Sequence, residues 1–469
     1  MKNLKLFFIY LFAFVVMLNT LLSAQTSDRG AVSKALISKI RQECVTEKGI
    51  VNAVSANDTR KLIVNRSNSG KIDDIFAIKL DIKGITNQKS SGRCWLFTSL
   101  NVLRQKARAK FNLSSFEFSE TYPFFWDQFE KANLFLEGVI KTRSKKMTDR
   151  KVEWLFKHPV GDGGVWNMAV AIIEKYGLAP KSAMPETYHS ENTRSMSRLI
   201  GLKLKEQGLK LRDLASKGKS VRYLRKEKEK MLEDIYKLLV YHLGEPPVKF
   251  SWRYKDKDGK LSQEKTYTPQ EFAKEVLDVD LRDYVMLMDD PTRPYYKLYE
   301  IEYDRDVYED FNWKYINLPS VELKKYALKS LLDKEPMYFS CDVGKQLDRK
   351  AGILSVENYD YKSLFGISFK MNKAQRILTS SSGSTHGMAL VGVDTSDTGK
   401  PVKWLLENSW GPSSGHNGFL IMTDKWFDEY MFRLVVLKKY IPENILNILK
   451  QKPVMLSPWD PMFLPVEDM

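Results

Sequence analysis

Residues 87–97, Asn-Gln-Lys-Ser-Ser-Gly-Arg-Cys-Trp-Leu-Phe, constrain the fold and chemistry of this chain more than any other segment. They place Cys94 just after a glycine turn and just before an apolar, helix-like run. A helix N-terminus and a nearby imidazolium both lower the pKa of a thiol, and only the thiolate is a good nucleophile. Gln88 lies upstream, where its amide can donate a hydrogen bond to the oxyanion formed by attack on a carbonyl. The segment therefore offers a nucleophile and an oxyanion donor, although a lone cysteine is more often buried and inert.

Two segments far downstream supply the partners that such a cysteine needs. Residues 384–393 place His386 at the head of an apolar strand, and residues 405–411 place Asn408 at the end of the next one. Acyl transfer by cysteine uses a histidine as base and acid and an asparagine to orient the imidazole. Because the three residues occur in the required order, we predict that Cys94, His386 and Asn408 form one catalytic group.

These segments resemble the bleomycin hydrolase and aminopeptidase C branch of the papain-like cysteine peptidases. The matching segments extend over most of the chain and are residues 87–97, 161–168, 176–182, 385–388, 407–411 and 458–462. The resemblance implies a papain-like fold, with Cys94, His386 and Asn408 as the triad and Gln88 as the oxyanion residue. One departure is Ser91, which stands where the papain signature has its first cysteine.

A pair of glycines bears on the substrate site. Adjacent glycines let a substrate backbone approach closely and pair with the chain. In the resembling peptidases such a pair, here Gly163 and Gly164, lines the cleft. Without Cys94, an ordinary glycine-rich turn would be the simpler interpretation.

The C-terminal arm bears on specificity. In the resembling enzymes this arm runs into the cleft, where the terminal carboxylate, here that of Met469, meets the α-ammonium of the substrate. That contact limits them to removing N-terminal residues. Residues 463–469 lack the small Gly-Ala-rich ending of the family, so Glu467 and Asp468 could supply the anion instead.

The separation between the two halves of the predicted site indicates an insertion. His386 follows Cys94 by 292 residues, against about 130–150 in papain-type enzymes. We place the insertion at residues 191–330, where two helices with a glycine turn are expected.

Residues 203–230 of this hairpin hold eleven Lys or Arg against four acidic residues. A solvated helical face is the simpler interpretation, and weak nucleic-acid or polyanion binding is the alternative. The resemblance implies homohexamers with a basic central channel.

The N-terminus predicts a secretory signal peptide in residues 1–24. Lys2 and Lys5 precede an apolar run that is shorter than the 18 or so residues needed to span a bilayer, and small residues precede Gln25. We expect cleavage, no membrane span afterwards, and a secreted or periplasmic protein. An uncleaved anchor is the alternative.

Composition limits the remaining function classes. The formal net charge of +16 favours anionic partners or serves solubility alone. Cys44, Cys94 and Cys341 do not form a disulfide framework. The other histidines show no metal-ligand spacing, and phosphate-loop and dinucleotide motifs are absent, so we expect no metal or cofactor.

The coarse organisation is helices first and antiparallel strands later, which is typical of an α+β fold. The expected parts are a signal peptide (1–24), an N-terminal extension (25–75), a helical half with the nucleophile (76–190), a basic helical insertion (191–330), a β-rich half with His386 and Asn408 (331–445) and a C-terminal arm (446–469). The hypothesis is a hexameric cysteine aminopeptidase acting on peptides. The alternatives are an endopeptidase with an open cleft and a basic polyanion-binding protein with a vestigial site.

Overall fold

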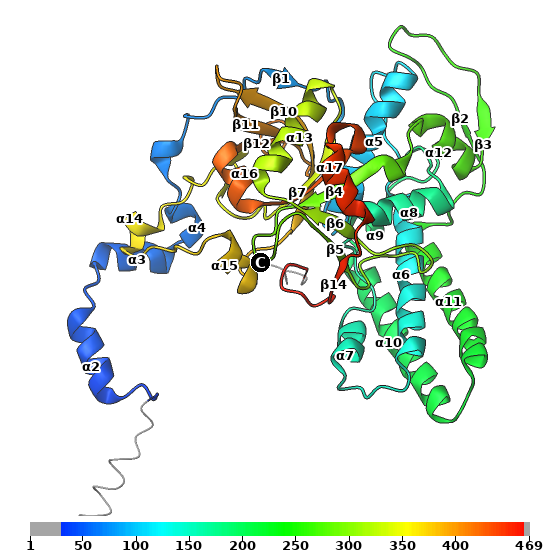
Figure 1. Cartoon of the computed structure of the whole chain (residues 1–469), viewed down its shortest axis with the longest axis horizontal. Coiled ribbons are helices and arrows are strands. Elements are labelled where there is room, and N and C mark those ends of the chain that lie inside the picture. Colours follow the sequence, from blue (N-terminus) through cyan, green and yellow to red (C-terminus); the bar gives the residue numbers. More distant parts are fainter. Residues whose placement is uncertain (1–29, 464–469) are drawn as a thin grey trace, which may run out of the picture. The chain divides into compact units, whose positions relative to one another are not determined.

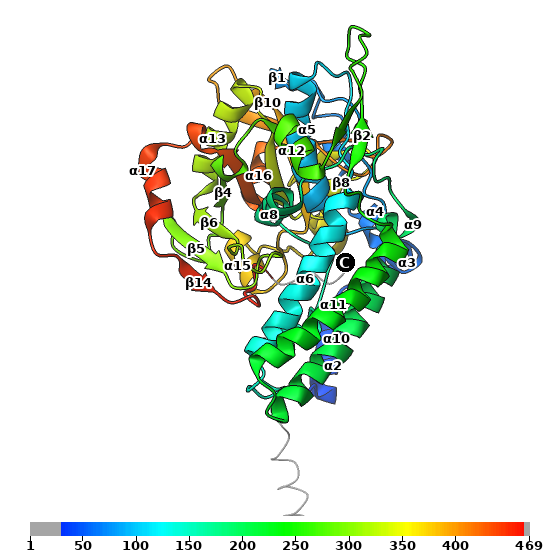
Figure 2. The same ribbon diagram turned by 90° about the vertical axis from the view of Figure 1, so that its right-hand side faces the viewer.

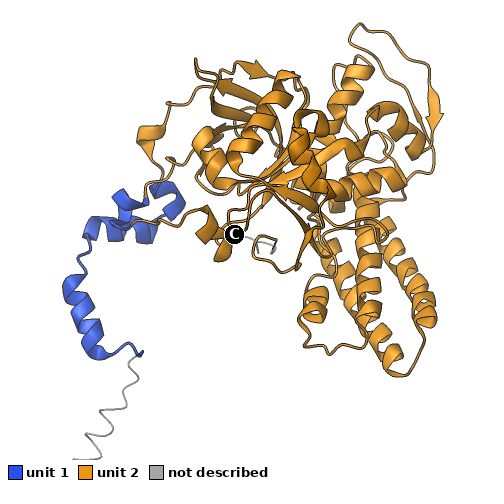
Figure 3. Cartoon of the chain, viewed as in Figure 1, with its two compact units in different colours: residues 1–63, 361–367 blue, residues 64–360, 368–469 orange. Residues whose placement is uncertain are grey.

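The computed structural model describes residues 30–463 (Figure 1). The expected signal peptide and the end of the C-terminal arm, Met469 included, lie outside the described residues. The chain divides into two compact units, one of residues 1–63 with 361–367 and one of residues 64–360 with 368–469 (Figure 3). Every residue of the predicted site belongs to the second unit.

The smaller unit consists mainly of short helices whose side chains are exposed or half-buried. They are α2 (Lys34–Glu43), α3 (Lys48–Ala56), α4 (Thr59–Leu62) and α14 (Tyr361–Phe365). None of them buries a residue. Local capping defines them instead: the side chain of Ser33 accepts the Leu36 N–H at the start of α2, and Asp58 accepts the Arg60 N–H at the start of α4.

The larger unit begins with a helical region that follows the predicted nucleophile. Its helices are α5 (Cys94–Lys110), α6 (Thr121–Lys141), α7 (Arg150–Lys157), α8 (Trp166–Tyr176), α9 (Tyr188–Glu191), α10 (Arg194–Ser216), α11 (Val221–Leu243) and α12 (Pro269–Leu277). Helices α6, α10 and α11 pack side by side (Figures 1 and 2). Gly208 permits this contact, because a Cβ there would lie 3.0 Å from the ring of Phe156 and 3.1 Å from that of Phe135.

A 12-stranded sheet forms the other half, in the order β14-β5-β6-β4-β13-β7-β10-β11-β12-β9-β8, with β1 added to β10. Its strands are β1 (Ile78–Lys79), β4 (Tyr284–Met288), β5 (Lys297–Ile301), β6 (Lys314–Asn317), β7 (Met337–Cys341), β8 (Leu347–Asp348), β9 (Ile353–Leu354), β10 (His386–Thr395), β11 (Pro401–Glu407), β12 (Phe419–Thr423), β13 (Met431–Leu437) and β14 (Val454–Leu456). The short strands β2 (Phe250–Trp252) and β3 (Lys265–Tyr267) pair separately. The further α-helices of this unit are α13 (Ser320–Leu332), α15 (Lys373–Leu378), α16 (Asp424–Tyr430) and α17 (Glu443–Leu446).

Helix α5 packs on strands β7 and β10 at the centre of this sheet. The contact depends on Gly387, where a Cβ would lie 3.1 Å from Thr98 Oγ1 and 3.5 Å from the Cys94 carbonyl oxygen. His386 begins β10 directly before this glycine. The close approach therefore brings the first residue of α5 against the strand that carries the histidine.

The insertion differs from the prediction of a helical segment through residue 330. Its long helices end at Leu243, and β4, β5 and β6 join the main sheet. Strand β4 is buried almost throughout, so its apolar run lacks the alternation that marks a half-exposed strand. Its partners β6 and β13 lie far along the chain, and no local pattern in residues 284–288 reveals that pairing.

The described helices were also compared with the length and apolarity needed to cross a membrane. Among residues 30–463, none meets both requirements. Helices and a largely antiparallel sheet together confirm the α+β class.

Candidate active site

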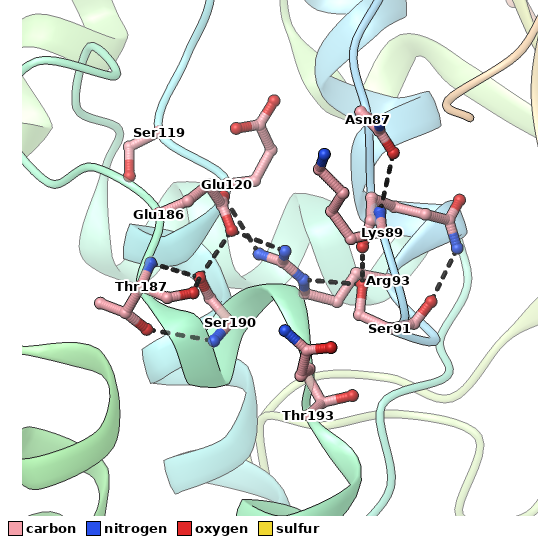
Figure 4. Close-up of polar contacts among 12 residues, drawn as sticks. Asn87, Lys89, Ser91, Arg93, Ser119, Glu120, Glu186, Thr187, Ser190 and Thr193 are labelled. Atoms are coloured by element: carbon pink, nitrogen blue, oxygen red, sulfur yellow. Dashed lines mark hydrogen bonds and ion pairs between the residues drawn. The ribbon is translucent and has the colours of Figure 1, made fainter. Parts of the chain in front are cut away.

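Cys94 is the first residue of α5 and lies partly buried. The turn before it is held by Arg93, whose side chain is fully buried. Arg93 donates to both carboxylate oxygens of Glu186 at 3.2 and 2.7 Å and to the Ser91 hydroxyl at 3.1 Å (Figure 4). Its guanidinium also lies over the rings of Phe97 and Phe124. A buried bidentate ion pair thus fixes the backbone from which the nucleophile projects.

His386 and Asn408 are in direct contact. His386 Nε2 lies 2.7 Å from Asn408 Oδ1. An amide oxygen only accepts hydrogen bonds, so this Nε2 carries a proton and Nδ1 of the neutral ring is the free base. Asn408 Oδ1 also accepts the Ser409 N–H at 2.8 Å, which fixes the amide. The ring of Trp410 covers the imidazole at 4.8 Å between centroids.

Gln88 is buried next to the asparagine loop. Its backbone N–H donates to the Ser409 carbonyl at 2.8 Å, and its Oε1 accepts the Ser409 hydroxyl at 2.6 Å. The Ser91 carbonyl can only accept hydrogen bonds, so the end of the Gln88 amide that faces it is the NH₂ group. One N–H of Nε2 donates to the Ser91 carbonyl at 2.7 Å, and the second remains available as an oxyanion donor.

Gly163 and Gly164 have different surroundings. A Cβ on Gly164 would lie 2.6 Å from the Trp95 ring, so only glycine allows this segment to pack on α5. A Cβ on Gly163 would meet nothing within 4 Å. Gly163 therefore leaves open space beside the backbone, as the predicted contact with a substrate chain requires.

Lys131 and Asp162 hold this glycine segment in place. Lys131 Nζ donates to the carbonyls of Gly161 at 3.0 Å and Gly163 at 2.6 Å, and pairs with Asp127 at 2.8 Å. The backbone carbonyl of Asp162 accepts the indole N–H of Trp95 at 2.7 Å.

The carboxylate of Asp162 makes further contacts. It accepts the Gly92 N–H at 3.1 Å and the Ser197 hydroxyl at 2.8 Å. The turn before Cys94, the glycine segment and the inserted helix α10 are therefore connected through one carboxylate.

The structure places most of the predicted site around one cavity of about 680 Å³. Cys94, His386, Gln88, Gly163 and Gly164 all line it. Asn408 lies behind His386 and does not reach the cavity wall. The C-terminal arm reaches the cavity through Met462 and Phe463. An ion pair of 2.9 Å between Asp460 and Arg293 anchors that arm.

Burial controls the charge of the cysteine and histidine. It raises the pKa of the Cys94 thiol, and backbone N–H groups of Gly387 and Trp95 and the charge of Arg433 oppose the rise. Burial also lowers the pKa of His386 to about 4, against the effect of the Asn408 hydrogen bond. The sequence argument from a helix N-terminus and an imidazolium predicted a lowered thiol pKa, and it did not include this desolvation. Burial therefore disfavours the charged forms of both groups in the free protein.

The other cysteines have different environments. Cys341 is completely buried opposite His386 in strand β7, and burial raises its pKa well above the usual range. Cys44 is exposed in the smaller unit. No cluster of potential metal ligands occurs within residues 30–463.

Sequence reasoning missed Ser409, Lys131, Asp162 and Arg433. Ser409 and Asp162 stand inside motifs that were recognised, but neither had an assigned role. Arg433 is the one charge in the apolar run of residues 431–437, and that contrast was a usable signal. Lys131 had no local signal, because its partners Gly161 and Gly163 lie about thirty residues away.

Known proteins are similar to this chain over most of its length. The model of the Peptidase C1-like family matches residues 32–463. Aminopeptidase C of Lactobacillus delbrueckii subsp. lactis is 39% identical over 416 residues, covering 88% of this chain and 92% of the relative. Human bleomycin hydrolase is 39% identical over 423 residues, covering 88% and 93%. The crystal structure of PepW from Lactobacillus rhamnosis HN001 superposes with a TM-score of 0.89 at 38% identity, covering 92% of this chain and 99% of that chain.

Fold and site together define a papain-like cysteine peptidase. The chain belongs to the Peptidase C1-like family and is a cysteine-type aminopeptidase of the bleomycin hydrolase group. The predicted resemblance, fold and enzyme class are confirmed.

Proposed function

We propose that Cys94, His386 and Asn408 are the catalytic triad with which this protein hydrolyses N-terminal residues from peptides. The observation that carries the proposal is the 2.7 Å contact of Asn408 with His386, which lines the same cavity as Cys94 and Gln88. Asn408 holds the imidazole with Nδ1 as the free base.

Acylation begins with transfer of the Cys94 thiol proton to His386 Nδ1. The thiolate forms a bond to the substrate carbonyl carbon, and the carbonyl π electrons move to oxygen. The free N–H of Gln88 Nε2 and the Cys94 backbone N–H stabilise this oxyanion. When the intermediate collapses, the C–N bond breaks and His386 gives its proton to the leaving amine. The product is a thioester with the N-terminal residue.

Deacylation repeats the sequence with water. His386 Nδ1 takes a proton from the water as its oxygen bonds to the thioester carbon. Collapse of the second oxyanion breaks the C–S bond. The imidazolium returns a proton to the Cys94 thiolate, and the amino acid leaves with a new carboxylate.

We further propose that the C-terminal arm restricts cleavage to N-terminal residues. Met462 and Phe463 reach the cavity, and the sequence that follows ends in Glu467, Asp468 and the carboxylate of Met469. An anion from this end would pair with the α-ammonium of the substrate, while the arm would occupy the subsites that an endopeptidase leaves open.

The proposed nucleophile is tested by single replacements. Cys94→Ser should abolish hydrolysis of a fluorogenic aminoacyl substrate, because a serine hydroxyl at this position lacks the acidity of a thiol. Cys341→Ser and Cys44→Ser are matched controls and should retain activity, since neither lines the cavity. Mass spectrometry after alkylation should locate one substrate-protected label on Cys94. Full activity in the Cys94→Ser protein would disprove the triad.

We also propose a homohexamer with the hairpin of α10 and α11 at a subunit contact or channel. Leu202, Leu209, Tyr223 and Tyr241 are exposed apolar residues on these helices, which suits a surface covered by another subunit. Native mass spectrometry of the full chain tests this assembly.

Residues 1–24 are proposed as an export signal, and N-terminal sequencing of the secreted fraction tests cleavage.

A further inference from the structure

Arg433 is a buried cation in strand β13. Only 8% of its surface is exposed. Within residues 30–463, its Nε has no hydrogen-bond partner and the side chain forms no ion pair with a carboxylate. The guanidinium lies over the rings of Trp313 at 5.4 Å and Phe463 at 5.6 Å. Cation–π contacts offset only part of the desolvation of a buried charge.

The side chain of Arg433 faces the catalytic cavity. In the sheet Arg433 pairs with Ser340, and Ser340 pairs with Gly387, so the three residues form one row on the same face. That face is the one on which Gly387 meets the start of α5. Both Arg433 and Cys94 line the cavity.

A local irregularity sets this orientation. The pairing of β13 with β7 shifts register between Met431 and Arg433. A β-bulge re-aims the side chains beside it, and bulges occur often next to active sites. Without the shift, the alternation of β13 would place Arg433 differently relative to Cys341 and Ser340.

Asp304 lines the same cavity as Arg433. Against the effect of burial, the charge of Arg433 lowers the Asp304 pKa, but the two side chains form no ion pair within residues 30–463. Asp304 Oδ2 is buried without a hydrogen-bond partner, and burial raises its pKa. A permanently charged guanidinium therefore remains available to a ligand in the cavity.

We propose that Arg433 is the carboxylate-binding residue of the cleft and determines which anionic groups enter it. The carboxylate comes from an Asp or Glu side chain of the peptide substrate or from the acidic end of the chain's own arm. Phe463, which lies over Arg433, is the last described residue before that end. The inference rests on the proposed peptidase function and adds an acidic specificity to it.

The experiment compares Arg433→Met and Arg433→Lys in the full chain and in a chain that ends at Phe463. Methionine keeps the apolar stem without the charge, and lysine keeps the charge without the bidentate fork. Replacing a buried charge that lacks an ion pair by methionine should not lower Tm, and lysine keeps both the charge and most of the apolar stem, so both proteins should fold. Arg253→Met removes an exposed charge away from the cavity and is the control.

The first arm tests substrate carboxylates. Pairs of peptides differ only by Glu or Gln, at the N-terminal or the following position. If the substrate supplies the anion, the Glu-to-Gln ratio of kcat/KM should fall about 10–100-fold in Arg433→Met, the effect of losing one charge-assisted hydrogen bond, and less in Arg433→Lys. Using a ratio cancels any general effect of the Arg433 charge on Cys94.

The second arm tests the chain's own end. If the arm supplies the anion, Arg433→Met in the full chain should admit N-blocked peptides as the shortened chain does. A synthetic peptide of residues 464–469 should then inhibit the shortened Arg433 protein about tenfold better than the shortened Arg433→Met protein.

The proposal is overturned if the Glu-to-Gln ratio, the rejection of N-blocked peptides and the inhibition by the peptide are all unchanged in Arg433→Met. Turnover of a neutral aminoacyl substrate and labelling of Cys94 are measured in parallel. Loss of both in the unaltered protein would disprove the proposed function itself, and would therefore be distinguishable from a failure of the Arg433 inference.

Discussion

The charge of a single side chain in this site depends on how many neighbours exclude water from it. Cys94 stands at a helix N-terminus and receives backbone hydrogen bonds, yet burial outweighs both and raises its pKa. His386 loses its charge for the same reason. The two groups become charged together, since proton transfer creates a thiolate and an imidazolium that stabilise each other.

Acid should destabilise the fold through His386. Its pKa is about 4 in the folded protein and 6.5 in the unfolded chain, so the unfolded state binds more protons between these values. The stabilisation that comes from the neutral His386 is complete above pH 6.5 and is lost as pH falls to 4. Between pH 7 and pH 4.5, the free energy of unfolding measured in urea should fall by about 2–3 kcal/mol more in the wild type than in His386→Leu.

Comparison of the two proteins isolates this histidine. Burial raises the pKa of Glu120 and of Glu407 to about 7, which has the opposite sign and adds stability as pH falls. Both acids remain in the variant, so their effect cancels. An equal loss in wild type and variant would contradict the buried, neutral state of His386.

Ser409 should act as a positioning residue for the oxyanion donor. Its hydroxyl donates to Gln88 Oε1 at 2.6 Å and so restrains rotation of the amide, whose NH₂ end donates to the Ser91 carbonyl. Loss of one oxyanion donor lowers kcat by about 10²–10³, which we expect for Gln88→Ala.

Ser409→Ala leaves the amide in place but free to rotate, so a fall of about tenfold in kcat with little change in KM is expected. Ser409→Thr, which retains the hydroxyl, should recover activity, and a Ser409→Ala loss as large as that of Gln88→Ala would argue against an indirect role.

At the scale of elements, the cleft is built where helix ends and strand ends meet through a few long-range contacts. The start of α5 meets β10 because Gly387 has no side chain. The glycine segment before α8 packs on α5 because Gly164 has none. Lys131 of α6 donates a hydrogen bond to the Gly163 carbonyl and so fixes the backbone of this segment.

Lys131→Met should impair substrate binding more than chemistry. The substitution frees the Gly161 and Gly163 carbonyls and leaves Asp127 buried without its partner, at a cost of about 3–5 kcal/mol in stability. We expect KM to rise about tenfold, with Cys94 alkylation unchanged. Steady-state kinetics and urea unfolding measure the two effects.

The double replacement Lys131→Met with Asp127→Leu separates these effects. Removing both charges should restore much of the stability, because no uncompensated charge remains. The high KM should persist, since the glycine carbonyls stay unbound. Recovery of KM together with stability would assign Lys131 a purely structural role.

At the scale of the whole molecule, the basic hairpin carries less free charge than its sequence indicates. Lys228 pairs with Glu137, Lys230 with Glu227, and Lys217 with Asp213. The hairpin therefore presents fewer unpaired basic side chains than the sequence count of eleven suggests. Lys205, Arg222 and Lys226 are exposed and have no ion pair among residues 30–463.

Charge reversal at these three positions tests the surface. Lys205→Glu, Arg222→Glu and Lys226→Glu together should weaken heparin or nucleic-acid binding and reduce its salt dependence, while peptide hydrolysis stays within about twofold. Fluorescence anisotropy at several salt concentrations measures the binding. If unaltered protein binds no polyanion, or binds independently of salt, the hairpin is a solvated or subunit-facing surface only.

By itself the sequence determined the family, the class of fold and the expected chemistry, because the motifs around Cys94, His386 and Asn408 are local and each requires particular residue types. It also placed the helical hairpin, whose apolar periodicity is visible within one segment. The arm, too, was recognisable from residues 458–462.

Only the tertiary structure decided which distant residues support that chemistry. Segments that meet only after folding form the hydrogen bonds of Asp162 to Gly92 and of Lys131 to Gly163, and they also bury Arg433. The placement of β4 in the main sheet has the same origin. Desolvation is likewise a property of the assembled core, and this is why the thiol pKa moved in the direction opposite to that expected from residues 87–97.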